Sequence, residues 1–265
     1  MTDGPKVLSW DIETAPNAAQ VWGIWKQNIG VKQIISDWWV LCWAAKWLGS
    51  DEIMSDAGIN YKTAFKRDME DDSRTCASIW NLLDEADWVV THHGNRFDIP
   101  KMNSRFLFHG MDPPSPFRSI DTCQIAKQIF GFTSNKLEYI ADHLGVGKKI
   151  DTGGFGLWAR CLQRDPQAWD DMVTYCRRDV ELLERVYLKM RPWSKSHPNW
   201  GLYVENADDP MCPKCGGAVN RKGFEYTTVG RYQRYKCKAC GAPSRGRSTN
   251  LDIDTKRRII TNVGG

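Results

Sequence analysis

Residues 7–14 read VLSWDIET, an apolar β-strand pattern that contains two carboxylates. Side chains two residues apart in a strand point to the same face of its sheet, so Asp11 and Glu13 share a face. Two adjacent carboxylates in apolar surroundings repel each other and are poorly solvated, and both effects raise their pKa values unless a cation neutralises them. Divalent cations such as Mg²⁺ prefer carboxylate oxygens. The stretch therefore predicts a buried strand that carries metal ligands; a strand at an exposed sheet edge is the alternative.

Strand-like and helix-like segments alternate along the first 190 residues. Short apolar or tryptophan-rich runs predict strands at 7–12, 21–25, 38–47, 52–55 and 87–91. Helical periodicity and capping residues predict helices at 73–86, 99–109, 122–130, 134–145 and from 166 to the proline at 192. This alternation, with several strands close together at the start, is typical of an α/β domain with a mixed sheet flanked by helices.

The composition changes near residue 194. We expect a catalytic domain at 1–193, a linker at 194–209 and a small β domain with a basic tail at 210–265. Residues 201–265 hold 12 Lys and Arg against 6 Asp and Glu, whereas residues 1–200 hold 24 against 26. A basic appendage on a mildly acidic body indicates a polyanionic partner, although a solvated basic tail would have the same composition.

Hydrophobic residues make up 42% of the chain and charged residues 26%, which is typical of a soluble globular protein. No apolar run approaches the roughly 18 residues that span a bilayer, and MTDGPKV at the start lacks the pattern of a signal peptide. Five of the nine cysteines are scattered singly, as reduced buried thiols are in cytosolic proteins. We therefore expect a cytoplasmic protein with no membrane partner.

Two further motifs contain acidic residues. In THHGNRFDIPKMNSR, at 91–105, Asp98 follows a short apolar strand and stands at the start of a helix, which it could simply cap. In YCRRD, Tyr175 and Asp179 are four residues apart on a predicted helix and therefore lie on one face of it. A tyrosine at such a position is often only a packing residue.

The D-x-E, N-R-F-D and Y-x-x-x-D motifs, in this order, resemble the DEDD superfamily of 3′–5′ exonucleases over about residues 5–190. The resemblance implies a ribonuclease H-like fold. It also implies that two divalent cations, Mg²⁺ or Mn²⁺, are held by four carboxylates, those of Asp11, Glu13, Asp98 and Asp179.

The subclass follows from the residue four positions before the last aspartate. Tyr175 occupies it, and Thr174 stands where the other branch has a histidine. The chain thus resembles the tyrosine branch, like the exonuclease domains of family-B DNA polymerases, and Tyr175 is expected to orient the attacking water or to assist its deprotonation. The segments at 132–149 and 154–158 and the cysteine-rich end resemble small exonucleases encoded by bacteriophages, which implies a role in DNA replication in a host cytoplasm.

Four residues are candidates for substrate binding. The resemblance implies that Asn95 and Phe97 contact the terminal nucleotide, although Phe97 could equally pack in the core. Asn135 and Lys136 are candidates to approach the phosphates, and a solvated helix start is the alternative for them.

Four cysteines form two C-x₂-C pairs, each followed by glycine and separated by 21 residues. Such pairs predict a tetrahedral, structural Zn²⁺ site, and the segment between them resembles a zinc ribbon built on a β-hairpin at 223–237. Two disulfides are the alternative, which a reducing cytosol disfavours. The expected zinc ligands are Cys212, Cys215, Cys237 and Cys240.

The expected ribbon interleaves basic and aromatic side chains, a combination suited to single-stranded nucleic acid. The aromatic residues could instead hold a small domain together, and the ribbon could dock a polymerase or another replication protein. The segments at 244–250 and 256–258 are expected to extend the positive charge into a flexible tail. The residues concerned are Arg221, Lys222, Arg231, Arg234, Lys236 and Lys238, with Phe224, Tyr226, Tyr232 and Tyr235.

The sequence thus predicts a metal-dependent 3′–5′ exonuclease that acts on nucleic-acid 3′ ends, with single-stranded DNA favoured. An exoribonuclease is one alternative, and a weakly active nucleic-acid-binding or replication-docking module is another. Intact Asp11, Glu13, Asp98, Tyr175 and Asp179 argue against the second.

Overall fold

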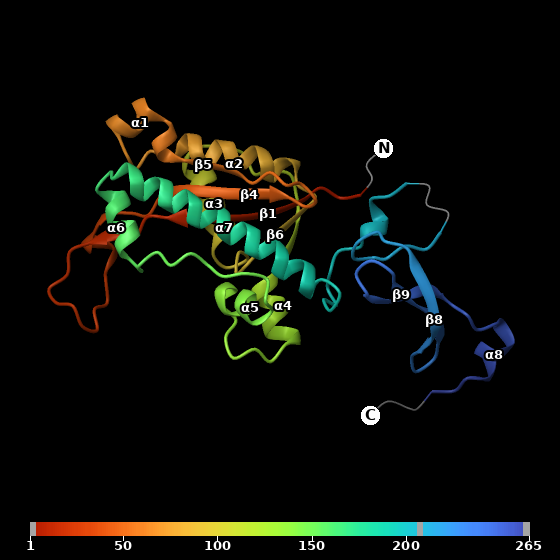
Figure 1. Ribbon diagram of the computed structural model, residues 1–265. Helices are drawn as coiled ribbons and strands as arrows, with labels where there is room; N and C mark the ends of the chain where they lie inside the picture. Colours follow the sequence, from red (N-terminus) through yellow and green to blue (C-terminus); the bar gives the residue numbers. More distant parts are fainter. Residues whose placement is uncertain (1–3, 206–208, 262–265) are drawn as a thin grey trace. The chain divides into compact units, whose positions relative to one another are not determined.

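The computed structural model describes residues 4–205 and 209–261. It divides into two compact units: Lys6–Tyr187, and a second that contains Gly4, Pro5 and the described residues from Leu188 onward (Figure 1). Positions 206–208 of the expected linker and 262–265 of the expected tail lie outside the described residues. Among the described residues, no helix is long and apolar enough to cross a membrane.

The Lys6–Tyr187 unit is built on a five-stranded mixed sheet with the strand order β5-β4-β1-β6-β7. Central β1 pairs with β4 in antiparallel and with β6 in parallel orientation, so that Ser9 lies opposite both Lys46 and Val90. β4 pairs antiparallel with β5, and β6 pairs parallel with β7. The strand bounds are β1 (Val7–Thr14), β4 (Val40–Trp47), β5 (Met54–Ala57), β6 (Trp88–Thr91) and β7 (Arg118–Asp121).

Helices cover both faces of this sheet (Figure 1). On one face, alternate β1 residues Leu8, Trp10 and Ile12 pack with α2 (Ser73–Glu85) and α3 (Asp98–Phe108). On the other face, α6 (Gly156–Leu162) and α7 (Pro166–Met190) pack against β4 and its neighbours. The remaining helices of the unit are α1 (Lys62–Arg67), α4 (Thr122–Ile129) and α5 (Leu137–His143). The expected α/β architecture with a mixed sheet between helices is confirmed.

The strand predicted at 21–25 is wrong. A two-residue strand, β2 (Ala18–Ala19), pairs with β3 (Ile34–Ser36), and between them lies an exposed segment whose only regular element is a 3-10 turn, η1 (Val31–Gln33). Its tryptophan-rich composition is typical of a strand, but none of the described neighbouring strands extends beside it to cover it. β7 was not predicted either, because its four residues follow a proline-rich break.

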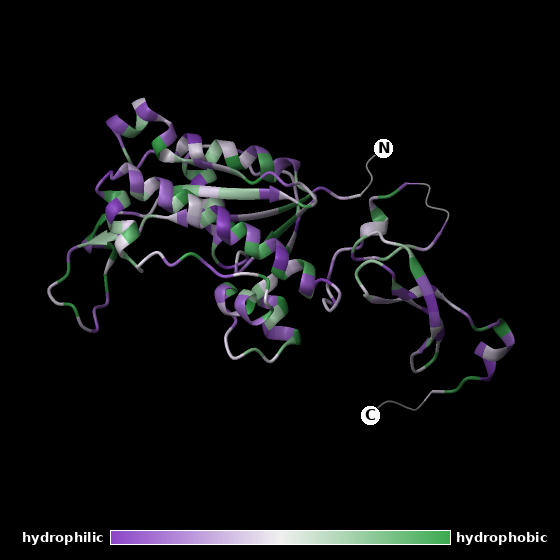
Figure 2. Cartoon of the chain, in the orientation of Figure 1, coloured by the Kyte–Doolittle hydropathy of each residue, from purple (hydrophilic) through white to green (hydrophobic). Residues whose placement is uncertain are grey.

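The second unit contains a three-stranded antiparallel sheet in the order β10-β9-β8. Figure 2 shows β8 as largely hydrophilic, in contrast to β4 in the larger unit. The expected flexible tail from residue 244 is wrong. This part of the chain adds β10 to the free edge of β9 and then forms α8, which Asp252 caps by accepting a hydrogen bond of 2.6 Å from the Thr255 amide. The elements are η3 (Trp200–Leu202), β8 (Val219–Tyr226), β9 (Arg231–Cys237), β10 (Pro243–Thr249) and α8 (Ile253–Arg258).

Candidate active site

Three carboxylates converge between β1 and α7. The oxygens of Asp11, Glu13 and Asp179 all lie within 4.8 Å of one another. Asp11 and Glu13 share the β1 face that looks toward α7, and the Cys176 Sγ on that helix lies 3.6 Å from the Asp11 carbonyl oxygen. Because β1 is paired on both sides, the alternative of an exposed edge strand does not apply.

Asp98 lies against the same strand. It is the first residue of α3, is only 2% exposed, and its Oδ1 accepts a hydrogen bond of 3.3 Å from the Ile12 amide. This bond fixes the carboxylate beside the backbone between Asp11 and Glu13. From the sequence, Asp98 was expected at a helix start, and a simple helix cap was the alternative role. Its hydrogen bond to β1 places it next to the other carboxylates.

Burial and mutual repulsion raise the pKa of these groups. Burial is the main cause at Asp11, and Asp98, Glu13 and Asp179 then add to it. Burial likewise raises the pKa of Glu13 to about 8 and that of Asp98 to about 7. Burial also raises the pKa of Asp179, against the opposing effect of Lys149. The raised pKa values mean that the surroundings do not compensate the negative charge that these four groups would carry when ionised.

This donor set fits a divalent cation. The Oδ1 atom of Asp179 is buried and has no hydrogen-bond partner among the described residues. A buried carboxylate oxygen without a partner is costly. Several carboxylate oxygens that converge at this spacing are the ligands that Mg²⁺ or Mn²⁺ prefers. The unpaired oxygen and the raised pKa values both point to a missing positive charge.

Lys149 is a site residue that was not predicted. It lies between α5 and α6, and its Nζ donates to Asp179 Oδ2 and, at 3.0 Å, to the Tyr175 hydroxyl. Burial lowers the pKa of Lys149, but the charge of Asp179 and the hydrogen bonds to Asp179 and Tyr175 together outweigh burial, so the net pKa is raised. The only sequence signal is a Lys-Lys pair after two glycines, and its first member, Lys148, has an 80% exposed side chain.

Tyr175 stands one helical turn before Asp179, as expected. Its ring meets the edge of Trp158 with the centroids 6.1 Å apart, and its hydroxyl accepts the hydrogen bond from Lys149. Burial and then the charge of Asp179 raise the pKa of Tyr175 to about 12. The hydroxyl therefore keeps its proton at neutral pH.

The four expected substrate contacts lie on three segments. Phe97 is 40% exposed, so the alternative of core packing is wrong for it. Asn95 instead accepts a hydrogen bond of 2.5 Å from the Ser119 hydroxyl on β7. Asn135 is anchored through its carbonyl, which accepts a bond of 2.8 Å from His92 Nε2, and exposed Lys136 precedes α5. Their roles in substrate binding stay predictions.

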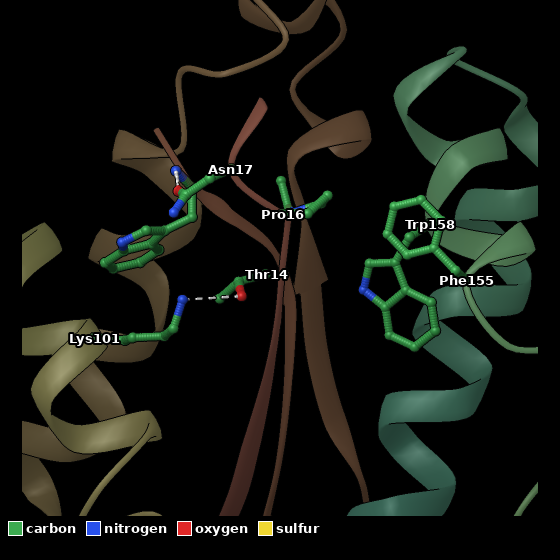
Figure 3. Close-up of a pocket in the computed structure, with 8 residues that line it drawn as sticks. Thr14, Pro16, Asn17, Lys101, Phe155 and Trp158 are labelled. Atoms are coloured by element: carbon green, nitrogen blue, oxygen red, sulfur yellow. Dashed lines mark hydrogen bonds between the residues drawn. The ribbon is translucent and has the colours of Figure 1, made fainter. Parts of the chain in front are cut away.

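A cavity of about 400 Å³ opens at the end of β1, one residue beyond Glu13 (Figure 3). Lys101 Nζ points toward Thr14, 3.3 Å from its hydroxyl, and lies 3.7 Å from the centre of the Trp38 ring. Figure 3 shows Phe155 and Trp158 on the other side of the β1 end from Lys101. The cavity adjoins the carboxylates, because it is lined by the neighbour of Glu13 and by the indole that packs on Tyr175. The lining residues are Thr14, Ala15, Pro16, Asn17, Trp38, Lys101, Phe155 and Trp158.

A protein-family model matches residues 48–191, more than half of the chain, and its family is the RNase H superfamily. The chain belongs to the RNase H superfamily. This confirms the ribonuclease H-like fold that the sequence motifs implied. The matched range includes Asp98, Tyr175 and Asp179, whereas β1 with Asp11 and Glu13 precedes it. Nucleases built on this fold use divalent metals, and the carboxylate cluster of this RNase H superfamily member is compatible with them.

The chain of this RNase H superfamily member is also similar to a solved structure. It is similar to the structure of the family B DNA polymerase from the hyperthermophilic archaeon Pyrobaculum calidifontis, with 15% sequence identity and a TM-score of 0.49. The similarity covers 71% of this chain and 25% of the polymerase, so the chain spans about a quarter of that protein. None of the curated proteins matches the chain.

In the second unit, four cysteine thiols form a compact group. The sulfurs of Cys212 and Cys240 lie 3.7 Å apart, and those of Cys215 and Cys237 lie 3.6 Å apart. Sulfurs placed tetrahedrally about 2.3 Å from a Zn²⁺ ion have neighbours about 3.8 Å away, so the spacing fits zinc. The alternative of two disulfides is not observed, because all nine cysteines are free thiols. The group could hold one Zn²⁺ ion.

Proposed function

We propose that the protein is a metal-dependent 3′–5′ exonuclease that hydrolyses phosphodiester bonds from nucleic-acid 3′ ends, with single-stranded DNA as its substrate. One observation carries the proposal: carboxylates from β1 and from α7, which are far apart in sequence, converge within 4.8 Å on an RNase H superfamily fold. In a cluster with only a structural role, basic side chains would balance the acidic ones. Here Lys149 supplies one positive charge for four acidic side chains.

Asp11, Glu13, Asp98 and Asp179 would hold two divalent cations. When bound, such cations supply Lewis-acid activation of a water molecule and neutralise charge on the phosphate and on the departing 3′ oxygen. The buried Asp179 Oδ1, which has no partner among the described residues, offers a free ligand atom for this purpose.

Tyr175 would orient the attacking water. Since Lys149 donates to the phenolic oxygen, the hydrogen of that hydroxyl would be available to a water molecule or a phosphate oxygen. Trp158 restrains the ring from the side, so the hydroxyl is held in place before substrate binds. The 3′–5′ direction rests on the resemblance of this Y-x-x-x-D helix to the tyrosine branch of exonucleases.

We further propose that residues 1–193 form the catalytic domain, that 194–209 link it to residues 210–265, and that the latter are a zinc ribbon. Its ligands would be Cys212, Cys215, Cys237 and Cys240, and with four thiolates the ion has no open position and is structural. The cationic strands of the ribbon would bind nucleic acid; docking to a polymerase or another replication protein is the second possibility.

The test uses DNA and RNA oligonucleotides of one sequence, labelled at the 5′ end, with Mg²⁺, Mn²⁺ or EDTA. We expect a ladder that shortens from the 3′ end with either metal and no cleavage in EDTA. Asp11→Ala should abolish the ladder, whereas Asp112→Ala, at an exposed position, should preserve it. Better cleavage of RNA would make the protein an exoribonuclease, and binding of both strands without cleavage would sink the exonuclease proposal.

A further inference from the structure

Residues 20–33, here termed the arm, project from the Lys6–Tyr187 unit (Figure 1, red). The two ends of the arm are joined at its base by the β2–β3 pair. A hydrogen bond of 2.9 Å from the Gln20 amide to the Gln33 carbonyl adds to this pairing. Trp22 is fully exposed, and the exposed fractions of Trp25 and Val31 are 81% and 84%. A chain that leaves two indoles in water loses the stabilisation that their burial would provide.

All charged residues of the arm are positive. Lys26 and Lys32 are its charged residues, and the sequence contains no acidic residue between Glu13 and Asp37. Both lysines are exposed and lie near the tryptophans in sequence. Exposed aromatic rings and cations on one loop suit a partner that combines negative charge with flat rings, which is the chemistry of an unpaired nucleic-acid strand.

The base of the arm forms part of the cavity beside the carboxylates. β1 ends at Thr14, the residue after Glu13, and Thr14 to Asn17 line the cavity on the way into the arm. On the way out, Trp38 lines the same cavity and its amide donates a bond of 2.9 Å to the Asn17 side chain. The two segments that line this part of the cavity therefore connect the arm directly to the strand that carries Asp11 and Glu13.

We propose that the arm binds single-stranded nucleic acid by stacking its bases on Trp22 and Trp25, and directs the 3′ end into the cavity. The proposal rests on the exonuclease function above and deepens it: the single strand must hold several unpaired nucleotides, enough to reach from the cavity to the arm, which neither a duplex end nor a mononucleotide ester provides. Paired bases present no free faces to the indoles, so stacking on Trp22 and Trp25 contributes to the binding of single strands only.

The decisive measurement is fluorescence anisotropy of a labelled 20-nucleotide single strand in EDTA, with the full-length chain. Trp22→Ala/Trp25→Ala should weaken binding at least about tenfold, given the stacking energy of each base. Leu107→Ala, which removes an 82% exposed side chain from α3, is the matched control and should leave the affinity unchanged. The affinity of the Trp22→Ala/Trp25→Ala variant for a blunt duplex of the same length should differ less than twofold from that of the unmodified chain.

Two further readouts separate the arm from the catalytic proposal. The Trp22→Ala/Trp25→Ala variant should hydrolyse a nitrophenyl ester of thymidine 5′-monophosphate at the rate of the unmodified chain. A plot of log affinity against log salt concentration has a negative slope. Lys26→Ala/Lys32→Ala should reduce the magnitude of this slope by about 1.4, because each phosphate contact on a single strand contributes about 0.7. Lys62→Ala, an exposed lysine on α1, is its control.

If the unmodified chain hydrolyses neither the ester nor the strand, the exonuclease proposal fails, while the anisotropy still decides whether the arm binds DNA. Unchanged affinity of the tryptophan variant for the 20-nucleotide strand overturns the arm proposal. Loss of self-association in light scattering, or of binding to vesicles, together with that unchanged affinity would assign the arm to a protein or a lipid surface instead.

Discussion

Lys149 donates hydrogen bonds to Asp179, thirty residues further along the chain, and to Tyr175, one helical turn before that aspartate. A single ammonium group thus links the acidic cluster to the phenol that we propose to orient water. We propose that Lys149 is a positioning residue that acts through Tyr175. It also connects the loop before α6 to the face of α7.

Removing the tyrosine hydroxyl should separate turnover from binding. Tyr175→Phe keeps the ring against Trp158 but deletes the oxygen that Lys149 holds. We expect turnover to fall at least about tenfold, within the range that a positioned acid–base group contributes, and the affinity for an oligonucleotide to change less than twofold. Single-turnover cleavage and anisotropy measure the two quantities. Tyr139→Phe on α5 is the control, and equal activity of Tyr175→Phe would remove Tyr175 from the mechanism.

Lys149 and Tyr175 should act as one unit. Lys149→Met alone should lower turnover, and the double variant with Tyr175→Phe should be no slower than the slower single variant, because both substitutions disrupt the same hydroxyl. Lys148→Met removes the exposed neighbouring lysine and should leave turnover unchanged. Additive losses in the double variant would mean that Lys149 acts independently of Tyr175.

Divalent cations should stabilise the fold through the carboxylates. A cation at 100 times its dissociation constant raises the free energy of unfolding by about 2.7 kcal/mol. We therefore expect Mn²⁺ to raise the melting temperature of the unmodified chain but not that of Asp179→Asn. Asp112→Asn serves as the matched variant and should respond as the unmodified chain does. Calorimetric titration with Mn²⁺ should give the same contrast, and undiminished Mn²⁺ binding by Asp179→Asn would contradict the ligand assignment.

Acid should destabilise the larger unit through His92. Burial lowers the pKa of His92 to about 4, against the raising effects of its bond to the Asn135 carbonyl and of Asp121. The unfolded chain binds the proton below about pH 6.5, so this contribution to stability is complete above that pH and is lost as pH falls toward 4.

The loss attributable to His92 is at most about 3 kcal/mol. Urea unfolding at a series of pH values should show it, and His92→Gln should flatten the slope between pH 6.5 and 4. His143→Gln at an exposed position is the control. A slope that His92→Gln leaves unchanged would show that other groups cause the acid sensitivity.

Zinc should be required only by the smaller unit. We expect one Zn²⁺ per chain by metal analysis and none in Cys237→Ser, while Cys123→Ala on α4 should keep its zinc. Removal of the ion should abolish the protection of β8 to β10 from hydrogen exchange, because so small a sheet has few apolar side chains to bury. Persistent protection in Cys237→Ser would show that the sheet does not depend on the metal.

The sequence predicted the elements whose residues carry their own signal. β1 and α7 have strong periodicity, and the resemblance of their D-x-E and Y-x-x-x-D motifs to the DEDD exonucleases singled out Asp11, Glu13 and Asp179, which the structure brings together. β1 proved central rather than an edge strand, which only the pairing with β4 and β6 decides. The order of the strands depends on such long-range pairing and could not be predicted.

Features that depend on distant partners were missed. The segment at 21–25 has a strand-like composition, yet it forms part of the exposed arm because no described strand lies beside it. Lys149 looks like any surface lysine, and its role arises only where its loop meets α7. Residues 244–249 are polar enough to suggest a tail, but the open edge of β9 supplies the backbone partners that make them a strand.

The positions of the acidic residues along the chain also bear on synthesis. The contact between Cys176 and Asp11 joins residues 165 positions apart. The site can therefore assemble only after α7 has been synthesised. Closing so long a loop is slow relative to local helix formation. A ribosome-bound chain that has reached α6 already presents Asp11, Glu13 and Asp98 but lacks the helix that completes their cluster. The proposed cleavage of nucleic acid would therefore begin only once the domain is nearly complete.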